Sequence, residues 1–87
     1  MTEQDVAGAV EQFVRREFSI SATDENFDQN VDLFEDGYVD SVGVTELLAF
    51  LETTFDVEIP EEDLFSSEFS TIEGIARIVA RNRPPRS

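Results

Sequence analysis

The amino-acid sequence predicts a small all-α bundle, with three long helices, a short helix before the last one and a long first loop. Three segments carry apolar residues at the spacing of a single helix face. A Ser, Thr or Asp residue precedes or opens each of these segments as an N-cap candidate. Leu, Ile, Val and Phe make up about 31% of the 87 residues, well above the roughly 20% below which a charged chain stays disordered. We therefore expect one small domain with a core of its own.

The start of the chain predicts a helix that fades between Phe18 and Ser21. Thr2 and Asp5 resemble a capping box, with Asp in place of the usual Glu. The residues that recur at helical spacing after this cap are Val6, Val10, Phe13 and Val14. This face of the helix should lie against the core.

The connection from residue 22 to residue 40 is long and acidic, but it is not purely polar. Five large apolar residues are spaced along it, namely Phe27, Val31, Leu33, Phe34 and Tyr38. A solvated linker would not need them, so we expect an ordered loop that is pinned onto the core. Gly37 is expected to supply a turn just before the next helix.

The second helix is expected to begin at Asp40 or Ser41, either of which is a good N-cap, and to run to about Phe55. Its core stripe consists of Val44, Leu47, Leu48, Leu51 and Phe55. The opposite side of the helix carries Val42, Glu46, Ala49 and Thr53. Gly43 lowers helix propensity in the first turn, and it either permits the close approach of another group or is neutral.

Shorter signals follow the second helix. Val57 and Ile59 indicate a short extended piece. Pro60 suits the first position of a short helix that ends before Phe69.

The last helix has a clear start signal, because Ser70 and Glu73 have the spacing of a capping box. Its core positions are Ile72, Ile75, Ala76 and Val79. We expect a folded domain over residues 1–82 and a flexible tail over residues 83–87, because the two prolines in that tail cannot continue the helix.

The composition argues against catalysis by this chain alone. The sequence contains no Cys, His or Lys, which removes the usual nucleophilic thiol, general base, metal ligand and Schiff-base amine. No apolar run is long enough to span a membrane and no signal-peptide pattern is present, so we expect a cytoplasmic protein.

The formal net charge of -14 limits the classes of molecule that the protein can bind. Such a surface repels nucleic acid and anionic lipid, and it attracts basic protein patches. Charge steering also suits frequent and brief encounters. We therefore expect a monomer whose partners are proteins, with no role in binding nucleic acid or membranes.

The segment from Tyr38 to Val42 is the most informative one for function. It places the hydroxyl of Ser41 at the start of an amphipathic helix, where backbone N–H groups are unpaired and carry partial positive charge. A phosphodiester attached to Ser41 would be well tolerated there. Judged from these residues alone, however, a Ser at a helix start is more often a simple cap.

Several motifs, taken in their order along the chain, favour an attachment site at Ser41 over a simple helix cap. The order of several short motifs resembles the pattern of acyl carrier proteins. These motifs are Gly37 to Val42, Glu46-Leu47-Leu48, Val57 to Pro60, Leu64, and Phe69 to Ile72. The resemblance covers most of the chain and implies an acyl-carrier-like four-helix bundle. The residues before Ser41 look closer to stand-alone carriers such as D-alanyl carrier proteins than to peptidyl carrier domains. Many relatives have Leu where this chain has Val42.

The resemblance implies that a separate transferase, with Mg²⁺, attaches 4′-phosphopantetheine from coenzyme A to Ser41. The chain would then be a non-catalytic carrier that holds an acyl or aminoacyl group as a thioester. Its partners would be the transferase, an adenylating or acyl-transferring enzyme, and downstream synthases or transferases. The residues implied in partner binding are Asp40, Val42, Glu46, Glu52, Glu61 and Glu62. The cargo stays open among fatty acyl, polyketide, amino acid and D-alanyl groups.

The acidic sequence is also compatible in part with two other functions, a calcium-binding loop and a cofactor-free interaction module. An EF-hand loop that starts at Asp28 would place Leu33 at the required Gly and Val39 at the last ligand position, so it fails twice. A cofactor-free acidic helical module that binds a basic protein surface explains the charge equally well. It does not explain the placement of Ser41 beside Val42, or the absence of Cys.

Overall fold

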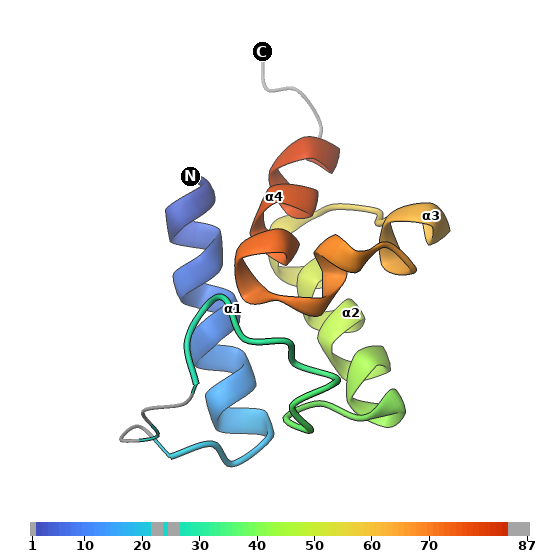
Figure 1. Ribbon diagram of the computed structural model, residues 1–87. Coiled ribbons are helices and arrows are strands. Elements are labelled where there is room, and N and C mark those ends of the chain that lie inside the picture. Colours follow the sequence, from blue (N-terminus) through green and yellow to red (C-terminus); the bar gives the residue numbers. More distant parts are fainter. Residues whose placement is uncertain (1, 22–23, 25–26, 84–87) are drawn as a thin grey trace.

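The computed structural model describes residues 2–21, 24 and 27–83. In this part of the chain the helices are α1 (Glu3–Glu17), α2 (Ser41–Phe55), α3 (Glu61–Leu64) and α4 (Ile72–Asn82), with a 3₁₀ helix, η1 (Ser67–Ser70), before α4. No strand occurs among these residues. The predicted all-α class and the predicted order of three long helices and one short helix are confirmed (Figure 1).

Helix α1 begins with the predicted capping box. The Asp5 N–H donates to the Thr2 hydroxyl at 3.1 Å, and the Thr2 N–H donates to the Asp5 carboxylate at 3.0 Å. That second bond lowers the pKa of the Asp5 carboxyl below its ordinary value. The helix ends at Glu17, with Phe18 as its C-cap.

The core is one cluster to which all three long helices contribute. Helices α1 and α4 pack directly against each other, whereas aromatic rings bridge α1 and α2. Phe13 of α1 stacks on Phe50 of α2 with ring centroids 4.1 Å apart. Most of the predicted core side chains are buried, including Val10, Phe13, Leu47, Leu51, Ile72 and Ile75. Val44 and Leu48 of the predicted α2 stripe are half-buried against this core.

The long first loop is ordered over its described residues, as predicted. Phe27 and Leu33 are buried, while Val31, Phe34 and Tyr38 pack against the core cluster. Backbone bonds attach the loop to the start of α4, since the Leu33 N–H donates to the Ser70 carbonyl at 2.7 Å and the Glu73 N–H donates to the Gln29 carbonyl at 2.9 Å. Residues 22–23 and 25–26 of this loop, and 84–87 of the predicted tail, lie outside the described residues.

Two helix starts in the last third of the chain differ by one residue from the predicted ones. Pro60 is the N-cap of α3 and not its first helical residue, because its ψ of 148° is extended. The N-cap of α4 is Thr71, whose hydroxyl accepts the Gly74 N–H at 2.9 Å. The predicted Ser70–Glu73 capping box is therefore absent. Ser70 belongs to η1, where its hydroxyl donates to the Ser67 carbonyl at 2.6 Å.

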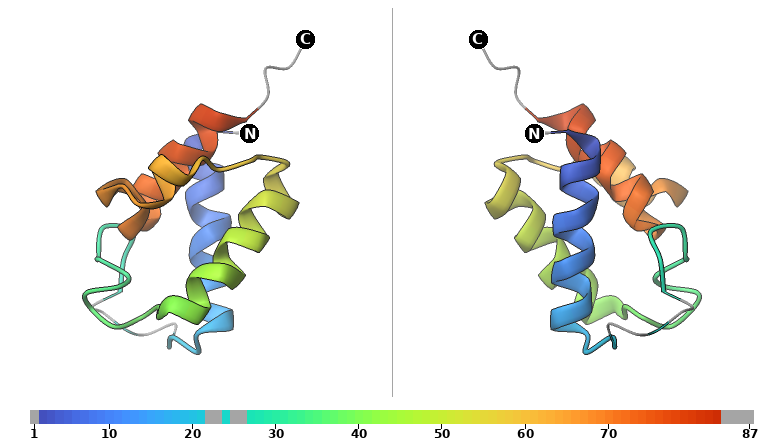
Figure 2. Two further views of the ribbon diagram at one scale, coloured as in Figure 1. Left: turned by 90° about the vertical axis from the view of Figure 1, so that its right-hand side faces the viewer. Right: turned by 90° about the vertical axis from the view of Figure 1, so that its left-hand side faces the viewer.

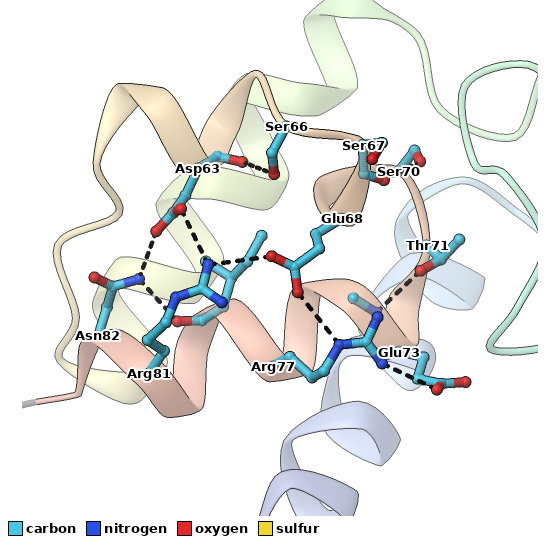
Figure 3. Close-up of polar contacts among 12 residues, drawn as sticks. Asp63, Ser66, Ser67, Glu68, Ser70, Thr71, Glu73, Arg77, Arg81 and Asn82 are labelled. Carbon is cyan, nitrogen blue, oxygen red and sulfur yellow. Dashed lines mark hydrogen bonds and ion pairs between the residues drawn. The ribbon is translucent and has the colours of Figure 1, made fainter.

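A cluster of charged side chains fixes α3 and η1 onto α4 (Figure 3). Arg77 pairs with Glu68 at 3.3 Å and with Glu73 at 3.0 Å. Arg81 pairs with Asp63 at 3.0 Å and with Glu68 at 3.3 Å. The pairs are exposed, so each one stabilises the fold only weakly. Their geometric effect is to hold α3 and η1 in one orientation.

Gly74 is where η1 comes closest to α4, and its replacement tests this packing. A Cβ atom on Gly74 would overlap the backbone carbonyl oxygen of Glu68. We expect Gly74→Ala to lower the free energy of unfolding by about 1–3 kcal/mol, because a backbone atom cannot rotate away. Urea denaturation of the full chain measures this change.

Gly8→Ala is the matched control, since Gly8 is also helical and a Cβ there meets nothing within 4 Å. Helix propensity alone should make that variant more stable by roughly 0.5–1 kcal/mol. Equal changes of the same sign in both variants would contradict the proposed contact between η1 and α4.

Candidate functional site

Ser41 is the first residue of α2, and its side chain is exposed. The N-cap is the preceding residue, Asp40, whose carboxylate accepts the Gly43 N–H at 2.8 Å. In the described part of the chain, the Ser41 hydroxyl makes no hydrogen bond to another side chain or to the backbone. Asp40 therefore caps the helix, and the hydroxyl of Ser41 is left free on the surface.

The backbone that leads to Ser41 is held by buried residues. Val39 is 3% exposed, and its N–H donates to the carbonyl of fully buried Leu33 at 2.9 Å. Gly37 adopts a positive φ of 80°, a conformation that glycine takes at little cost. This is the turn that the sequence predicts. Because both ends of the segment are anchored, the position of Ser41 is set by the core.

Gly43 makes room for an aromatic ring beneath the first turn of α2. A Cβ atom at this position would lie 2.6 Å from Cε1 of Phe18 and 3.0 Å from Cγ1 of Val39. Phe18 in turn packs edge-to-face on Phe13, with ring centroids 6.5 Å apart. The group that approaches Gly43 closely is thus a side chain of this protein. Phe18 and Val39 are positioning residues, and no local sequence pattern marks them as such.

The start of α2 is suited to a negatively charged substituent. The N–H groups of Ser41 and Val42 have no carbonyl four residues earlier within the helix. They lie at the positive end of the helix dipole, where a phosphate is stabilised. The free hydroxyl supplies an ester oxygen, and its exposure admits a large modifying enzyme. The residues present therefore fit a covalently attached phosphodiester.

The predicted partner-binding residues fall into two groups. Asp40, Val42 and Glu46 are exposed around the start of α2, and Val42 is 68% exposed. Glu61 and Glu62 are exposed on α3, which lies away from the start of α2 (Figures 1 and 2).

Glu52 belongs to neither group. It is half-buried, and it accepts the Ile59 N–H at 3.5 Å, so its carboxylate faces the connection after α2.

Tyr38 ties the described part of the loop together next to this site. Its hydroxyl donates to the Asp24 carboxylate at 3.4 Å, and its ring packs edge-to-face on Phe27 with centroids 5.0 Å apart. Partial burial, together with the negative charge of Asp24, raises the pKa of the Tyr38 hydroxyl above its ordinary value.

Neither a metal site nor a membrane span is evident within residues 2–21, 24 and 27–83. No group of three or more His, Cys, Asp and Glu side chains there is arranged to hold a metal ion. No helix in the same residues has the length and apolar character needed to cross a membrane.

The pKa of Tyr38 can be measured directly, because the chain contains one Tyr and no Trp. We expect ultraviolet absorbance titration of the folded protein to give a pKa above the ordinary value of about 10. The folded state then holds this proton more tightly than the unfolded state. The resulting stabilisation is complete below about pH 10 and is lost as the pH rises through the folded pKa.

Asp24→Asn should move the pKa of Tyr38 back towards the value measured in urea. Glu35→Gln is the control. Glu35 is an exposed acid in the same loop, and it takes no part in the hydrogen bond of Tyr38. A Tyr38 pKa that is equal in folded and unfolded protein would contradict this contact.

Substitutions at Asp40 and Ser41 should separate the cap from the free hydroxyl. Asp40→Ala is expected to lower the free energy of unfolding by about 0.5–2 kcal/mol, because the Gly43 N–H loses its acceptor. Ser41→Ala should leave stability unchanged within about 0.5 kcal/mol. Thermal or urea denaturation measures both, and a larger loss for Ser41→Ala would mean that Ser41 is the cap.

Comparisons with known proteins identify relatives. A family model described as a phosphopantetheine attachment site matches residues 9–79. The D-alanyl carrier protein of Lactococcus lactis subsp. cremoris (strain MG1363) is 37% identical over 59 residues, which cover 67% of this chain and 75% of that protein. The D-alanyl carrier protein of Lactococcus lactis subsp. lactis (strain IL1403) is 33% identical over 66 residues, which cover 75% of this chain and 84% of that protein. No solved structure gives a significant match.

Proposed function

Because this chain belongs to the acyl carrier protein family, whose members bear a phosphopantetheine attachment site, we propose that Ser41 is the residue that carries the arm. The covalent cofactor of this family is 4′-phosphopantetheine. The observation that supports Ser41 is the cap at Asp40, which leaves an exposed hydroxyl at the positive end of α2. We take residues 1–82 as the carrier unit.

The chain itself is a non-catalytic carrier that separate enzymes modify and load. In the proposed modification, the Ser41 oxygen attacks the phosphorus of coenzyme A that bears the pantetheine group and becomes an ester oxygen of the phosphodiester. The P–O bond of the pyrophosphate breaks, adenosine 3′,5′-bisphosphate leaves, and the hydroxyl proton passes to a base of the transferase or to water. A phosphopantetheinyl transferase with Mg²⁺ supplies the catalytic groups. The first turn of α2 stabilises the new negative charge through its free N–H groups. When bound, the cofactor supplies a thiol at the end of a flexible arm.

The composition suits the storage of a thioester on that arm. The sequence contains no Cys and no Lys, so no side-chain thiol or lysine amine can attack the loaded group. The arm lets one cargo reach several active sites without diffusing away, which raises its effective concentration at each of them. The similarity to D-alanyl carrier proteins favours D-alanine as the cargo. Fatty acyl, polyketide and other amino acid cargoes are the alternatives.

The proposed docking surface for the transferase and the loading enzyme is the start of α2. It presents Val42 as an apolar contact, with the carboxylates of Asp40 and Glu46 beside it. Basic groups on a partner would be drawn to this end by the net charge of -14. Glu52 near the end of α2, and Glu61 and Glu62 on α3, lie apart from this surface. Their predicted role in partner binding stays a prediction. The cytoplasmic location and the monomeric state expected from the sequence stay predictions.

Intact mass spectrometry tests the attachment of the cofactor. After co-expression with a broad-specificity phosphopantetheinyl transferase, we expect the full chain to gain the mass of one phosphopantetheinyl group. Ser41→Ala should abolish that gain, because the ester oxygen is missing. Mass spectrometry of the thioester recovered from source cells then identifies the cargo.

Ser67→Ala is the matched control, since Ser67 is also exposed and also opens a helical segment. It should gain the full mass. If the wild-type chain gains no mass while a reference carrier protein in the same cells is modified, the proposed function is wrong. The cofactor-free acidic module would then be the better description.

A further inference from the structure

Arg15, in the last turn of α1, binds the long loop and has no place in the attachment chemistry described above. Its side chain is 22% exposed, compared with 71% for Arg16, 44% for Arg77 and 49% for Arg81. A charged group that loses this much water needs partners within the protein. The partners of Arg15 lie in α1 and in the loop that leads to Ser41.

The guanidinium of Arg15 joins two points of this loop. One terminal nitrogen donates to the Ser21 carbonyl at 2.7 Å, and the other donates to the Phe27 carbonyl at 3.4 Å. Its Cζ atom also lies 4.6 Å from the centroid of the Phe27 ring, which is a cation–π contact. Hydrogen bonds from a charged donor are stronger than neutral ones. Arg15 therefore fixes both Ser21 and Phe27 relative to α1.

Glu11 holds the guanidinium in this orientation. The Glu11 carboxylate accepts Nε of Arg15 at 3.1 Å and the side-chain amide of Gln29 at 3.1 Å. The carbonyl of Gln29 in turn accepts the Glu73 N–H at 2.9 Å. The contacts of Arg15 thus belong to a network that includes α1, the long loop and the start of α4.

Phe27 connects Arg15 to the segment that carries the attachment site. The ring that lies against the guanidinium also packs edge-to-face on Tyr38, with centroids 5.0 Å apart. Tyr38 directly precedes buried Val39, and Ser41 follows two residues later. A continuous chain of contacts therefore runs from Arg15 through Phe27 and Tyr38 towards Ser41.

The stability of α1 alone does not account for these contacts. A basic residue in the last turn of a helix interacts favourably with the helix dipole, and both Arg15 and Arg16 are placed there. Arg16 has this position while its side chain stays exposed, with Glu17 at 3.9 Å. What Arg15 adds is the connection to Ser21 and Phe27.

We propose that Arg15 is a positioning residue for the modification of Ser41, because it holds the loop so that the segment ending at Ser41 meets the transferase in one geometry. This inference deepens the proposed function and rests on it. Phe18, the C-cap of α1, supports the first turn of α2 at Gly43, where the two helix ends lie side by side (Figure 2). Without Arg15, only a fraction of the molecules would present Ser41 correctly, and the apparent affinity for the transferase would fall by that fraction.

The charge of Arg15 by itself predicts the opposite change. Removing it makes the chain one unit more negative than -14, which strengthens the attraction of basic groups on a partner. A purely electrostatic role would therefore lower the KM of the transferase for this chain or leave it unchanged. A rise in KM on loss of a positive charge is the signature of positioning.

The test measures the kinetics of phosphopantetheinyl transfer, with the unmodified full chain as the varied substrate at saturating coenzyme A. All variants are compared at a temperature at which circular dichroism shows them to be folded. We expect Arg15→Met to raise the KM for the chain by roughly threefold or more and to leave kcat within about twofold, because bound molecules have regained the geometry.

Arg16→Met is the matched control, since it removes the same charge from the neighbouring exposed position. Its KM should not rise. An unchanged KM for Arg15→Met, or an equal rise in both variants, would overturn the proposal.

Arg15→Lys keeps the positive charge, and it is the second variant if Arg15→Met does not fold. Its KM should still rise, because an ammonium group lacks the fork with which the guanidinium reaches both carbonyls. Phe27→Leu should raise the KM as well, and Arg15→Met in that background should add little more. Fully additive increases would show that Arg15 does not act through Phe27 and would overturn the proposed route.

Tyrosine fluorescence reports on the same contacts without a transferase, since the chain contains one Tyr and no Trp. Acrylamide should quench Tyr38 more efficiently in Arg15→Met than in the wild type or in Arg16→Met, because Phe27 no longer holds the ring in place. If the wild-type chain gains no phosphopantetheinyl group, the proposed function is wrong, whatever the quenching shows. If the wild type is modified and the KM for Arg15→Met is unchanged, the proposed function stands and only the role of Arg15 is wrong.

Discussion

The hydrogen bond between the Asp40 carboxylate and the Gly43 N–H is the interaction on which the site depends. The first N–H groups of a helix have no partners within it, and Asp40 supplies an acceptor for one of them. Ser41 does not act as the N-cap, and its hydroxyl is exposed to solvent. The arrangement holds because Val39 is buried on one side and Phe18 fills the space beneath Gly43 on the other. Capping and the proposed covalent modification thus fall to two adjacent side chains.

The charge of the protein is distributed unevenly over its surface. Among the described residues, no buried side chain is polar or charged, so the core carries no electrostatic cost. The arginines of α4 are engaged by acids from α3, η1 and α4 itself. Helix α2 contains no basic residue at all. The result is one surface on which charge is largely compensated, and others, along α2 and on α3, that are open to a basic partner.

Features set by local sequence were predictable, and those set by distant contacts were not. The stripe from Leu47 to Phe55 and the Thr2–Asp5 box follow from helical spacing alone. The start of α4 does not follow from helical spacing. The Glu73 N–H donates to the carbonyl of Gln29 in the long loop, and Ser70 is the last residue of η1. The sequence also could not show that Phe18 lies under Gly43. The exposure of the Phe65 side chain had no local signal either, since an aromatic residue after a short helix is usually expected inside.

The bond from Leu33 to Ser70 has a consequence for how the protein is made. It joins segments far apart in the chain, so it forms late and requires loop closure first. A chain emerging from the ribosome delivers its N-terminal half before residues 70–73 exist. Until then, the backbone that leads into α2 lacks its anchor. A nascent or truncated polypeptide would therefore not hold Ser41 in the geometry of the folded protein. Only a completed chain would present Ser41 in that geometry.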